Sequence, residues 1–159
     1  MISIIDVEAS GLHFDSYPIE VAVLINNQTY SWLIKPEASW QYWCKTAESL
    51  HGITREVLQK EGESAVFVVN ELIQLLEGTG GLLYSDAANW DADWVSTLFY
   101  AAKEFMPFHI TSIYELLDKG QSQRFDYTKA RLVETSEYKQ HRAEDDVRMI
   151  YQAYIEASR

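Results

Sequence analysis

The chain of 159 residues, 47% of them hydrophobic and 13% aromatic, is of the right size and composition for one compact domain, expected over residues 1–159. Thirteen Lys and Arg against 24 Asp and Glu give a formal net charge of −11, which excludes a protein that holds nucleic acid by counterion release alone. One cysteine excludes an internal disulfide, and no apolar run of about 18 residues could cross a membrane. Because the N-terminus also lacks signal-peptide features, we expect a cytoplasmic protein.

The first part of the chain predicts three consecutive strands. Residues 2–7 are nearly all apolar, which is typical of a strand buried on both faces, and this strand ends at the acids Asp6 and Glu8. Residues 19–26 and 28–35 are predicted as two further strands, joined by a tight turn at an Asn-Asn pair. The three strands would form a meander.

The middle of the chain is predicted to be partly helical. Residues 36–50 are irregular, and a short helix is then expected from the N-cap Thr54 to Lys60. Residues 63–77 place apolar side chains at three- and four-residue spacing, which predicts an amphipathic helix that Gly78 ends.

The second half alternates short strands with helices. A strand over residues 82–85 leads into a helix that breaks at Pro107. Residues 108–112 predict another strand, followed by a helical turn that Gly120 ends. Two more helices are expected, over residues 127–134 and 143–157.

Two pairs of polar residues lie at opposite ends of the chain. Asp6 and Glu8 are two positions apart on a strand, so both side chains point to the same face. His141 precedes Asp146 by five residues where the last helix begins. Carboxylate oxygens are preferred ligands of hard divalent cations, and bound cations would allow an acidic chain to act on a phosphodiester. These pairs therefore predict a divalent-metal site.

The order of strands and helices is that of a ribonuclease H-like α/β domain, a mixed five-stranded sheet flanked by helices. Within this order the chain closely resembles the DEDDh exonucleases, the DnaQ-like superfamily of proofreading subunits and ribonuclease T. The resemblance rests on four segments that together span nearly the whole chain: residues 6–12 (DVEASGL), 50–54 (LHGIT), 90–94 (WDADW) and 141–146 (HRAEDD).

The resemblance implies a cofactor of two Mg²⁺ or Mn²⁺ ions, about 3.5 to 4 Å apart. Asp6 would bridge both ions, and Glu8 would bind one of them and help to orient the attacking water. Asp91 and Asp146 would complete the ligand set from two helices. His141 would accept the proton of the attacking water, because an imidazole with a pKa of about 6.5 suits a base at neutral pH.

The loop after the first strand is implied to bind the 3′-terminal nucleotide. Leu12 matches the family position that packs on the terminal bases, and the backbone of Ala9, Ser10 and Gly11 would approach the terminal sugar. His51 lies in the family phrase of residues 50–54 and is either a substrate contact or a structural residue of a turn.

The middle motif departs from the family pattern. Family members commonly show His-Asn, two residues and then Phe-Asp, whereas here Ser85 and Asp86 are followed by three residues before the Trp-Asp pair. The spacing from Asp91 to Trp94 favours Asp91 as the metal ligand, with Asp86 and Asp93 as alternatives. The departure puts in doubt any substrate contact made by the family's His-Asn pair.

Aromatic side chains are dense between residues 32 and 43. They either pack in the core or an interface, or stack on unpaired bases. Dimers are common among the relatives, so a homodimer that uses the surface near Trp40 is one option. Five basic residues ahead of the last helix either guide a phosphate backbone or form a solvated face: Arg124, Lys129, Arg131, Lys139 and Arg142.

The leading expectation is a metal-dependent 3′–5′ exonuclease that hydrolyses single-stranded DNA or RNA ends to 5′-nucleoside monophosphates. Two alternatives come from other classes of protein: a catalytically weak module that binds nucleic-acid ends, and a structural subunit of a polymerase or repair complex. The presence of the four acids and of His141 favours the enzyme. No residue decides between DNA and RNA.

Overall fold

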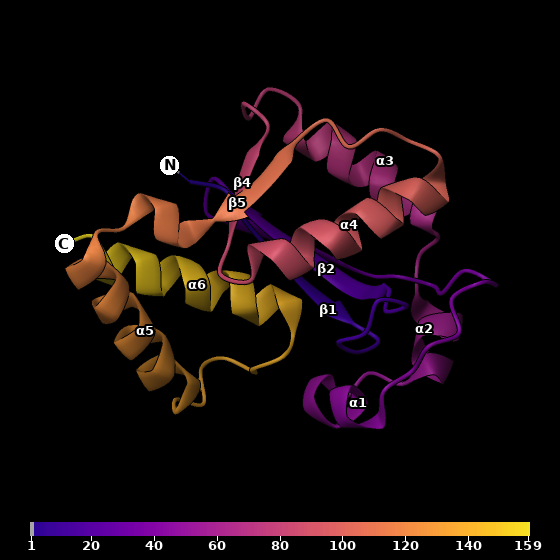
Figure 1. Cartoon of the computed structure of the whole chain (residues 1–159), viewed down its shortest axis with the longest axis horizontal. Helices are drawn as coiled ribbons and strands as arrows, with labels where there is room; N and C mark the ends of the chain where they lie inside the picture. The colour runs from indigo at the N-terminus through magenta and orange to yellow at the C-terminus, as the bar shows by residue number, and fades with distance from the viewer. Residues whose placement is uncertain (1) are drawn as a thin grey trace.

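A five-stranded mixed sheet forms the centre of the computed structural model, which describes residues 2–159 and leaves Met1 of the expected domain outside the described residues (Figure 1). The strands run in the order β3-β2-β1-β4-β5, and β1 pairs antiparallel with β2 and parallel with β4. Their bounds are β1 Ile4–Ala9, β2 Pro18–Ile25, β3 Gln28–Leu33, β4 Leu82–Ser85 and β5 His109–Ser112. The prediction of a mixed five-stranded sheet is confirmed.

Helices cover both faces of the sheet (Figure 1). The long helices are α3 Ala65–Leu76, α4 Ala88–Ala102, α5 Lys119–Val133 and α6 Ala143–Ala157. Ile5 and Val7 of β1 pack against α3 and α4, whereas Ile4 packs in a second cluster with α5 and α6. Because side chains alternate along a strand, Asp6 and Glu8 lie on the same face as Ile4, towards α6.

Three short elements complete the fold: α1 Lys45–His51, α2 Arg55–Glu61 and the 3₁₀ helix η1 Ile113–Leu116. A third apolar cluster, which includes Tyr17, Ile19 and Leu58, attaches α2 to the beginning of β2. The prediction that residues 36–50 are irregular is wrong for α1. This helix has no strong start signal in the sequence, because its N-cap Cys44 makes no side-chain cap hydrogen bond.

The first strand is shifted two residues towards the C-terminus from the predicted residues 2–7. It continues through Ala9, so Asp6 and Glu8 lie inside β1 instead of at its end. The pairing with β2 shifts register between Glu8 and Ala9, which is the signature of a β-bulge. Such an irregularity re-aims the chain at the point where it leaves the sheet for the loop of residues 10–17.

The prediction that Gly120 ends a helical turn is also wrong, because Gly120 lies in the first turn of α5. Asp118 and Gln121 form a capping box that starts this helix, and Phe125 and Leu132 are buried beneath it. The cap and the buried face together outweigh the cost of about 1 kcal/mol for one glycine in a helix.

Two local signals in the sequence are confirmed. The Thr54 hydroxyl accepts the Val57 N–H at 3.2 Å and caps α2. Asn26 and Asn27 both have positive φ, 51° and 63°, as a tight turn between paired strands requires.

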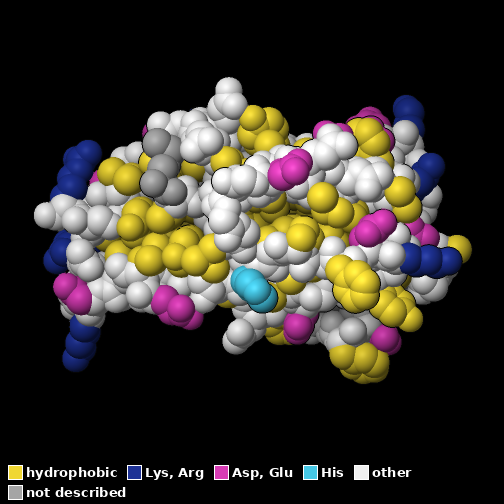
Figure 2. Space-filling view, turned by 90° about the horizontal axis from the view of Figure 1, so that it is seen from above, with side chains coloured by type: hydrophobic (Ala, Val, Ile, Leu, Met, Phe, Trp, Pro, Cys, Tyr) yellow, Lys and Arg dark blue, Asp and Glu magenta, His cyan; other side chains and the backbone are white. Residues whose placement is uncertain are grey.

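The surface is rich in apolar side chains. In the view from above, hydrophobic side chains are exposed across the middle of the molecule, while Lys and Arg lie towards its two ends (Figure 2). Phe14, Tyr100 and Phe105 are each more than four-fifths exposed. None of the helices within residues 2–159 is both long enough and apolar enough to cross a membrane.

Candidate active site

Three carboxylates meet where β1 lies against the first turn of α6. Asp6 and Glu8 come from β1, and Asp146 comes from α6; their oxygens lie within 4.8 Å of one another. The two strand positions share a face because they are two residues apart. The structure therefore brings together three of the four predicted metal ligands, from segments about 140 residues apart in the chain.

All three carboxyl groups of the cluster have raised pKa values. Burial raises the pKa of Asp6 well above its ordinary value, and the charges of Asp91 and Asp146 raise it further. Burial and then Asp146 raise the pKa of Glu8 to about 9, while the pKa of Asp146 is raised to about 6, chiefly by burial. Acids this close cannot all ionise without a compensating positive charge.

Two oxygen atoms of the cluster have no partner among the described residues. Asp6 Oδ2 and Asp146 Oδ1 are buried and accept no hydrogen bond. A buried carboxylate oxygen without a partner costs free energy, and a divalent cation satisfies such an oxygen directly. The donor set, which consists of oxygens alone, fits a hard cation such as Mg²⁺ or Mn²⁺.

Asp91, the fourth predicted ligand, is buried in the first turn of α4, outside the group of three. The Ser85 hydroxyl donates a hydrogen bond of 2.5 Å to Asp91 Oδ2. Burial raises the pKa of Asp91 to about 7, against the lowering effect of Ser85. Among the charges that raise the pKa of Asp6, that of Asp91 is the largest, so the fourth acid lies beside the cluster.

Asp86 and Asp93, the alternative metal ligands of the middle motif, lie in different environments from Asp91. Asp86 forms an ion pair with Lys129 of α5. This pair is largely enclosed, with side-chain exposures of 9% and 32%, and Lys129 lowers the pKa of Asp146 and Asp91 through its charge. Asp93 follows Asp91 on α4 but does not belong to the group of three acids. In the Ser-Asp pair that replaces the family's His-Asn, Ser85 therefore orients Asp91, and Asp86 pairs with Lys129.

His141 lies in the turn that precedes α6. Its φ of 61° is left-handed, which is uncommon for a residue other than glycine. The imidazole lines the same hollow as Glu8. Burial and then the charge of Lys129 lower the pKa of His141, so the ring is neutral and can accept a proton at neutral pH.

An ion pair that the sequence did not reveal holds this turn in place. Arg142 donates to the buried Glu20 of β2, with Nη2 2.9 Å from Oε1, and the Ala143 N–H donates to Oε2 at 3.2 Å. Glu20 thus anchors the start of α6 and with it the position of Asp146. A charged residue in the otherwise apolar run of β2 was the available signal, because such a residue is buried only when it is paired.

A hollow of about 190 Å³ lies beside Glu8 and His141. Most of its walls are apolar, from Leu12, Leu50 and Trp94, and the predicted substrate residues Ala9, Gly11 and His51 also line it. Ser10 is the exception among the predicted contacts, because its buried hydroxyl accepts the Tyr17 N–H at 3.1 Å and holds the loop instead.

His51 has one unsatisfied nitrogen in this hollow. Its Nδ1 accepts the Ile53 N–H at 3.0 Å, which leaves the ring proton on Nε2 when the ring is neutral. Nε2 is buried without a partner among the described residues. The ring therefore carries an N–H group with no acceptor among the described residues.

Fold and site together define an α/β domain with a candidate divalent-metal site on its central strand. The chain belongs to the RNase T exonuclease family, whose family model, described as an exonuclease, matches residues 3–154. No curated protein sequence matches the chain.

Solved structures share the fold at low sequence identity. The zinc-bound complex of E. coli exonuclease I with single-stranded DNA has a TM-score of 0.74 and 16% identity, and the match covers 99% of this chain and 40% of that one. Exonuclease I from Methylocaldum szegediense has a TM-score of 0.71 and 16% identity, with coverages of 100% and 41%. A 3′-exonuclease studied for its recognition of the histone mRNA stem-loop has a TM-score of 0.72 and 17% identity, with coverages of 98% and 62%.

These likenesses show the ribonuclease H-like fold that the sequence predicted. The chain spans about two-fifths of the length of the two exonuclease I proteins.

Proposed function

We propose that this chain is a metal-dependent 3′–5′ exonuclease that removes 5′-nucleoside monophosphates from single-stranded DNA or RNA ends. The observation that carries the proposal is the meeting of Asp6, Glu8 and Asp146 beside His141, with two buried carboxylate oxygens left unpartnered. Membership of an exonuclease family gives the reaction class.

Asp6, Glu8 and Asp146 would hold two Mg²⁺ or Mn²⁺ ions, with Asp91 as a fourth ligand from α4. When bound, such ions supply positive charge to the scissile phosphate and so offset the −11 charge of the chain locally.

The side chains around the acids have separate roles in the reaction and in substrate binding. His141, neutral at working pH, accepts the proton of the attacking water. Glu8 helps to orient that water. The apolar hollow takes the terminal nucleotide, with Leu12 packed against its base and His51 Nε2 as a donor to its sugar or phosphate.

The solved relatives support a substrate with an accessible end. One was solved with single-stranded DNA, and another concerns 3′-end recognition of an RNA stem-loop. The hollow of about 190 Å³ has room for one terminal nucleotide at most, so the nucleotide that enters it must be unpaired.

The test is digestion of 5′-labelled single-stranded DNA and RNA of matched sequence with Mg²⁺ or Mn²⁺. We expect a ladder that shortens from the 3′ end and disappears with EDTA, with Asp6→Asn and with Asp91→Asn. Asp93→Asn is the matched control, since it removes an acid from the same helix outside the cluster. Binding of both nucleic acids without shortening under either metal would refute the enzyme and favour an end-binding module.

A further inference from the structure

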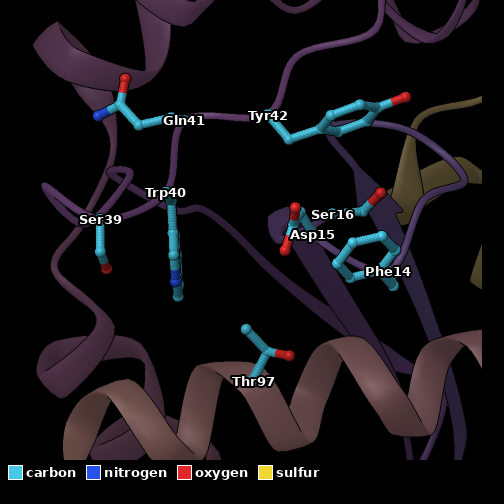
Figure 3. A pocket seen from close by; sticks show the side chains of 8 residues that line it. All are labelled: Phe14, Asp15, Ser16, Ser39, Trp40, Gln41, Tyr42 and Thr97. Carbon is cyan, nitrogen blue, oxygen red and sulfur yellow. The ribbon is translucent and has the colours of Figure 1, made fainter.

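A second and larger recess lies next to the active-site hollow. It has a volume of about 570 Å³, within the range of about 300 to 1,000 Å³ that small-ligand sites occupy. Trp40 forms one side, Phe14 and Asp15 the other, Tyr42 lies above and Thr97 of α4 below (Figure 3). None of the catalytic residues proposed above lines this aromatic recess.

One loop and one helix separate the two depressions. The loop of residues 10–17 contributes Leu12 to the active-site hollow and Phe14 to the aromatic recess. Helix α4 contributes Trp94 to the hollow and Thr97 to the recess. Residues three apart on a helix are neighbours on its surface, about 5 to 6 Å between Cβ atoms, so the two depressions adjoin.

The wall between the depressions is held rigidly. The Ser10 N–H donates to the Tyr17 carbonyl at 3.0 Å, and the Cys44 N–H donates to the Ser10 carbonyl at 2.8 Å. Gly11 lies so close to Tyr42 that an added Cβ would be 2.7 Å from the ring. A preformed wall costs little ordering entropy when a ligand binds.

The aromatic side chains are packed from behind by other rings. Tyr42 stacks on His13 with 4.6 Å between ring centroids, and Trp40 stacks on Tyr17 at 5.2 Å. Phe14 is 88% exposed. Rings that are supported on one side and accessible from the recess offer stacking surfaces for a planar group.

The polar groups of the recess favour a base over a phosphate. The Thr97 hydroxyl donates to the Asp93 carbonyl at 3.0 Å, so its oxygen is left as an acceptor, and the Asp15 carboxylate is an acceptor as well. Ser16, Ser39 and Gln41 add hydroxyl and amide groups to the lining, and none of the described lining residues is Lys or Arg. Acceptors and donors together suit the polar edge of a nucleobase, whereas a phosphate would meet the like charge of Asp15 without a cation.

We propose that the aromatic recess binds one unpaired nucleobase of the substrate strand, upstream of the 3′-terminal nucleotide. This inference rests on the proposed function. A strand whose last nucleotide fills the active-site hollow crosses the exposed Leu12 and Phe14, and the recess takes the next base within reach. Phe14 and Tyr42 then determine how tightly longer strands bind, without contacting the reacting atoms.

The experiment combines abasic substrates with Phe14→Ala. Single-stranded oligonucleotides carry one abasic nucleotide at each successive position from the 3′ end, and KM and kcat are measured for each. We expect one upstream position at which the missing base raises KM by roughly 5- to 150-fold, the range for one lost aromatic stack. Phe14→Ala should raise KM for the complete strand in the same range and abolish the abasic penalty at that position alone.

Phe105→Ala is the matched control, because Phe105 is 94% exposed and lies outside the recess. A second readout places fluorescent 2-aminopurine at each position, with Ca²⁺ in place of Mg²⁺ or Mn²⁺, so that the acidic site carries cations and binding is followed separately from turnover. Quenching at one upstream position supports base binding in the recess if it is lost in Phe14→Ala and kept in Phe105→Ala. This support holds even if no strand is shortened, because the absence of shortening refutes only the proposed exonuclease function.

Three results would overturn the inference. The abasic penalties could be the same in Phe14→Ala as in the unmodified chain. Phe105→Ala could have the same effect as Phe14→Ala. Sedimentation could show a dimer that Phe14→Ala dissociates, with equal losses for complete and abasic strands, and the recess would then be a contact between two copies of the chain.

Discussion

The Glu8 carboxyl is expected to destabilise the cation-free protein as the pH rises. Burial and then Asp146 raise the pKa of Glu8 to about 9, whereas a glutamate in an unfolded chain has a pKa of about 4.3. The folded state therefore keeps a proton that the unfolded state releases. The stability from this proton is fully present below about pH 4.3, and it is lost as the pH rises to about 9.

The magnitude follows from this window. Each pH unit above the unfolded-state pKa of about 4.3 lowers the free energy of unfolding by about 1.4 kcal/mol. The loss of stability from Glu8 at pH 8 is therefore at most about 5 kcal/mol. A glutamine at position 8 needs no proton and keeps an N–H donor towards Asp146, which hydrogen-bonds Glu8. We expect Glu8→Gln to raise the free energy of unfolding at pH 8 in EDTA by about 1 to 5 kcal/mol, and to change it little at pH 4.

Urea unfolding across this pH range, in EDTA and in excess Mn²⁺, is the assay. Mn²⁺ should reduce the advantage of Glu8→Gln, because cations that bind only the folded state add about 2.7 kcal/mol at one hundred times their dissociation constant, and Glu8→Gln loses a ligand. Glu61→Gln, an exposed acid at the end of α2, serves as the control. A lower stability of Glu8→Gln at pH 8 in EDTA, or an equal change at pH 4 and pH 8, would refute the reasoning.

Three further outcomes are expected. His141→Ala should lower kcat by about 10² to 10⁴-fold with little change in KM, and an undiminished kcat would contradict its role as the base. Because burial lowers the pKa of His141, the acid limb of the kcat/KM profile of the unmodified chain should lie below about pH 6.5. Glu20→Gln removes the charge paired with Arg142 and should cost about 2 kcal/mol in urea unfolding, whereas no loss would show that the pair does not hold α6. Gly11→Ala places a Cβ 2.7 Å from Tyr42 and should lower stability by about 1 to 3 kcal/mol, read as a lower Tm; an unchanged Tm would mean that the ring moves freely.

Local periodicity was enough to predict much of the fold and the core of the site. Asp6 and Glu8 share a face wherever residues 4–9 form a strand, even though the strand begins and ends two residues later than predicted. The amphipathic spacing of α3 and α6 depends on residues within each helix, and both helices were predicted. The structure then brings Asp146 to the two strand acids, where spacing alone could only place it at the beginning of a helix.

Long-range pairs account for what the sequence could not predict. Glu20 and Arg142 are 122 residues apart, and no local pattern links them. Lys129 of α5 and Asp86, which follows β4, are likewise 43 residues apart in the chain. Pairings of this kind depend on which helices cover which face of the sheet, a property of the assembled core and not of any segment.

The acid cluster explains how a strongly acidic chain can act on a polyanion. Without cations, Asp6, Glu8 and Asp146 keep protons that their solvated counterparts would have lost, which is the sign of a site with more negative charge than it can hold. Cation binding must therefore release protons, and the affinity for cations must rise with pH as fewer protons compete. The pKa of Asp146, raised to about 6, lies below physiological pH, whereas that of Glu8 lies above it. Glu8 therefore holds a proton at physiological pH that the cations must displace, and this proton couples occupancy of the site to pH.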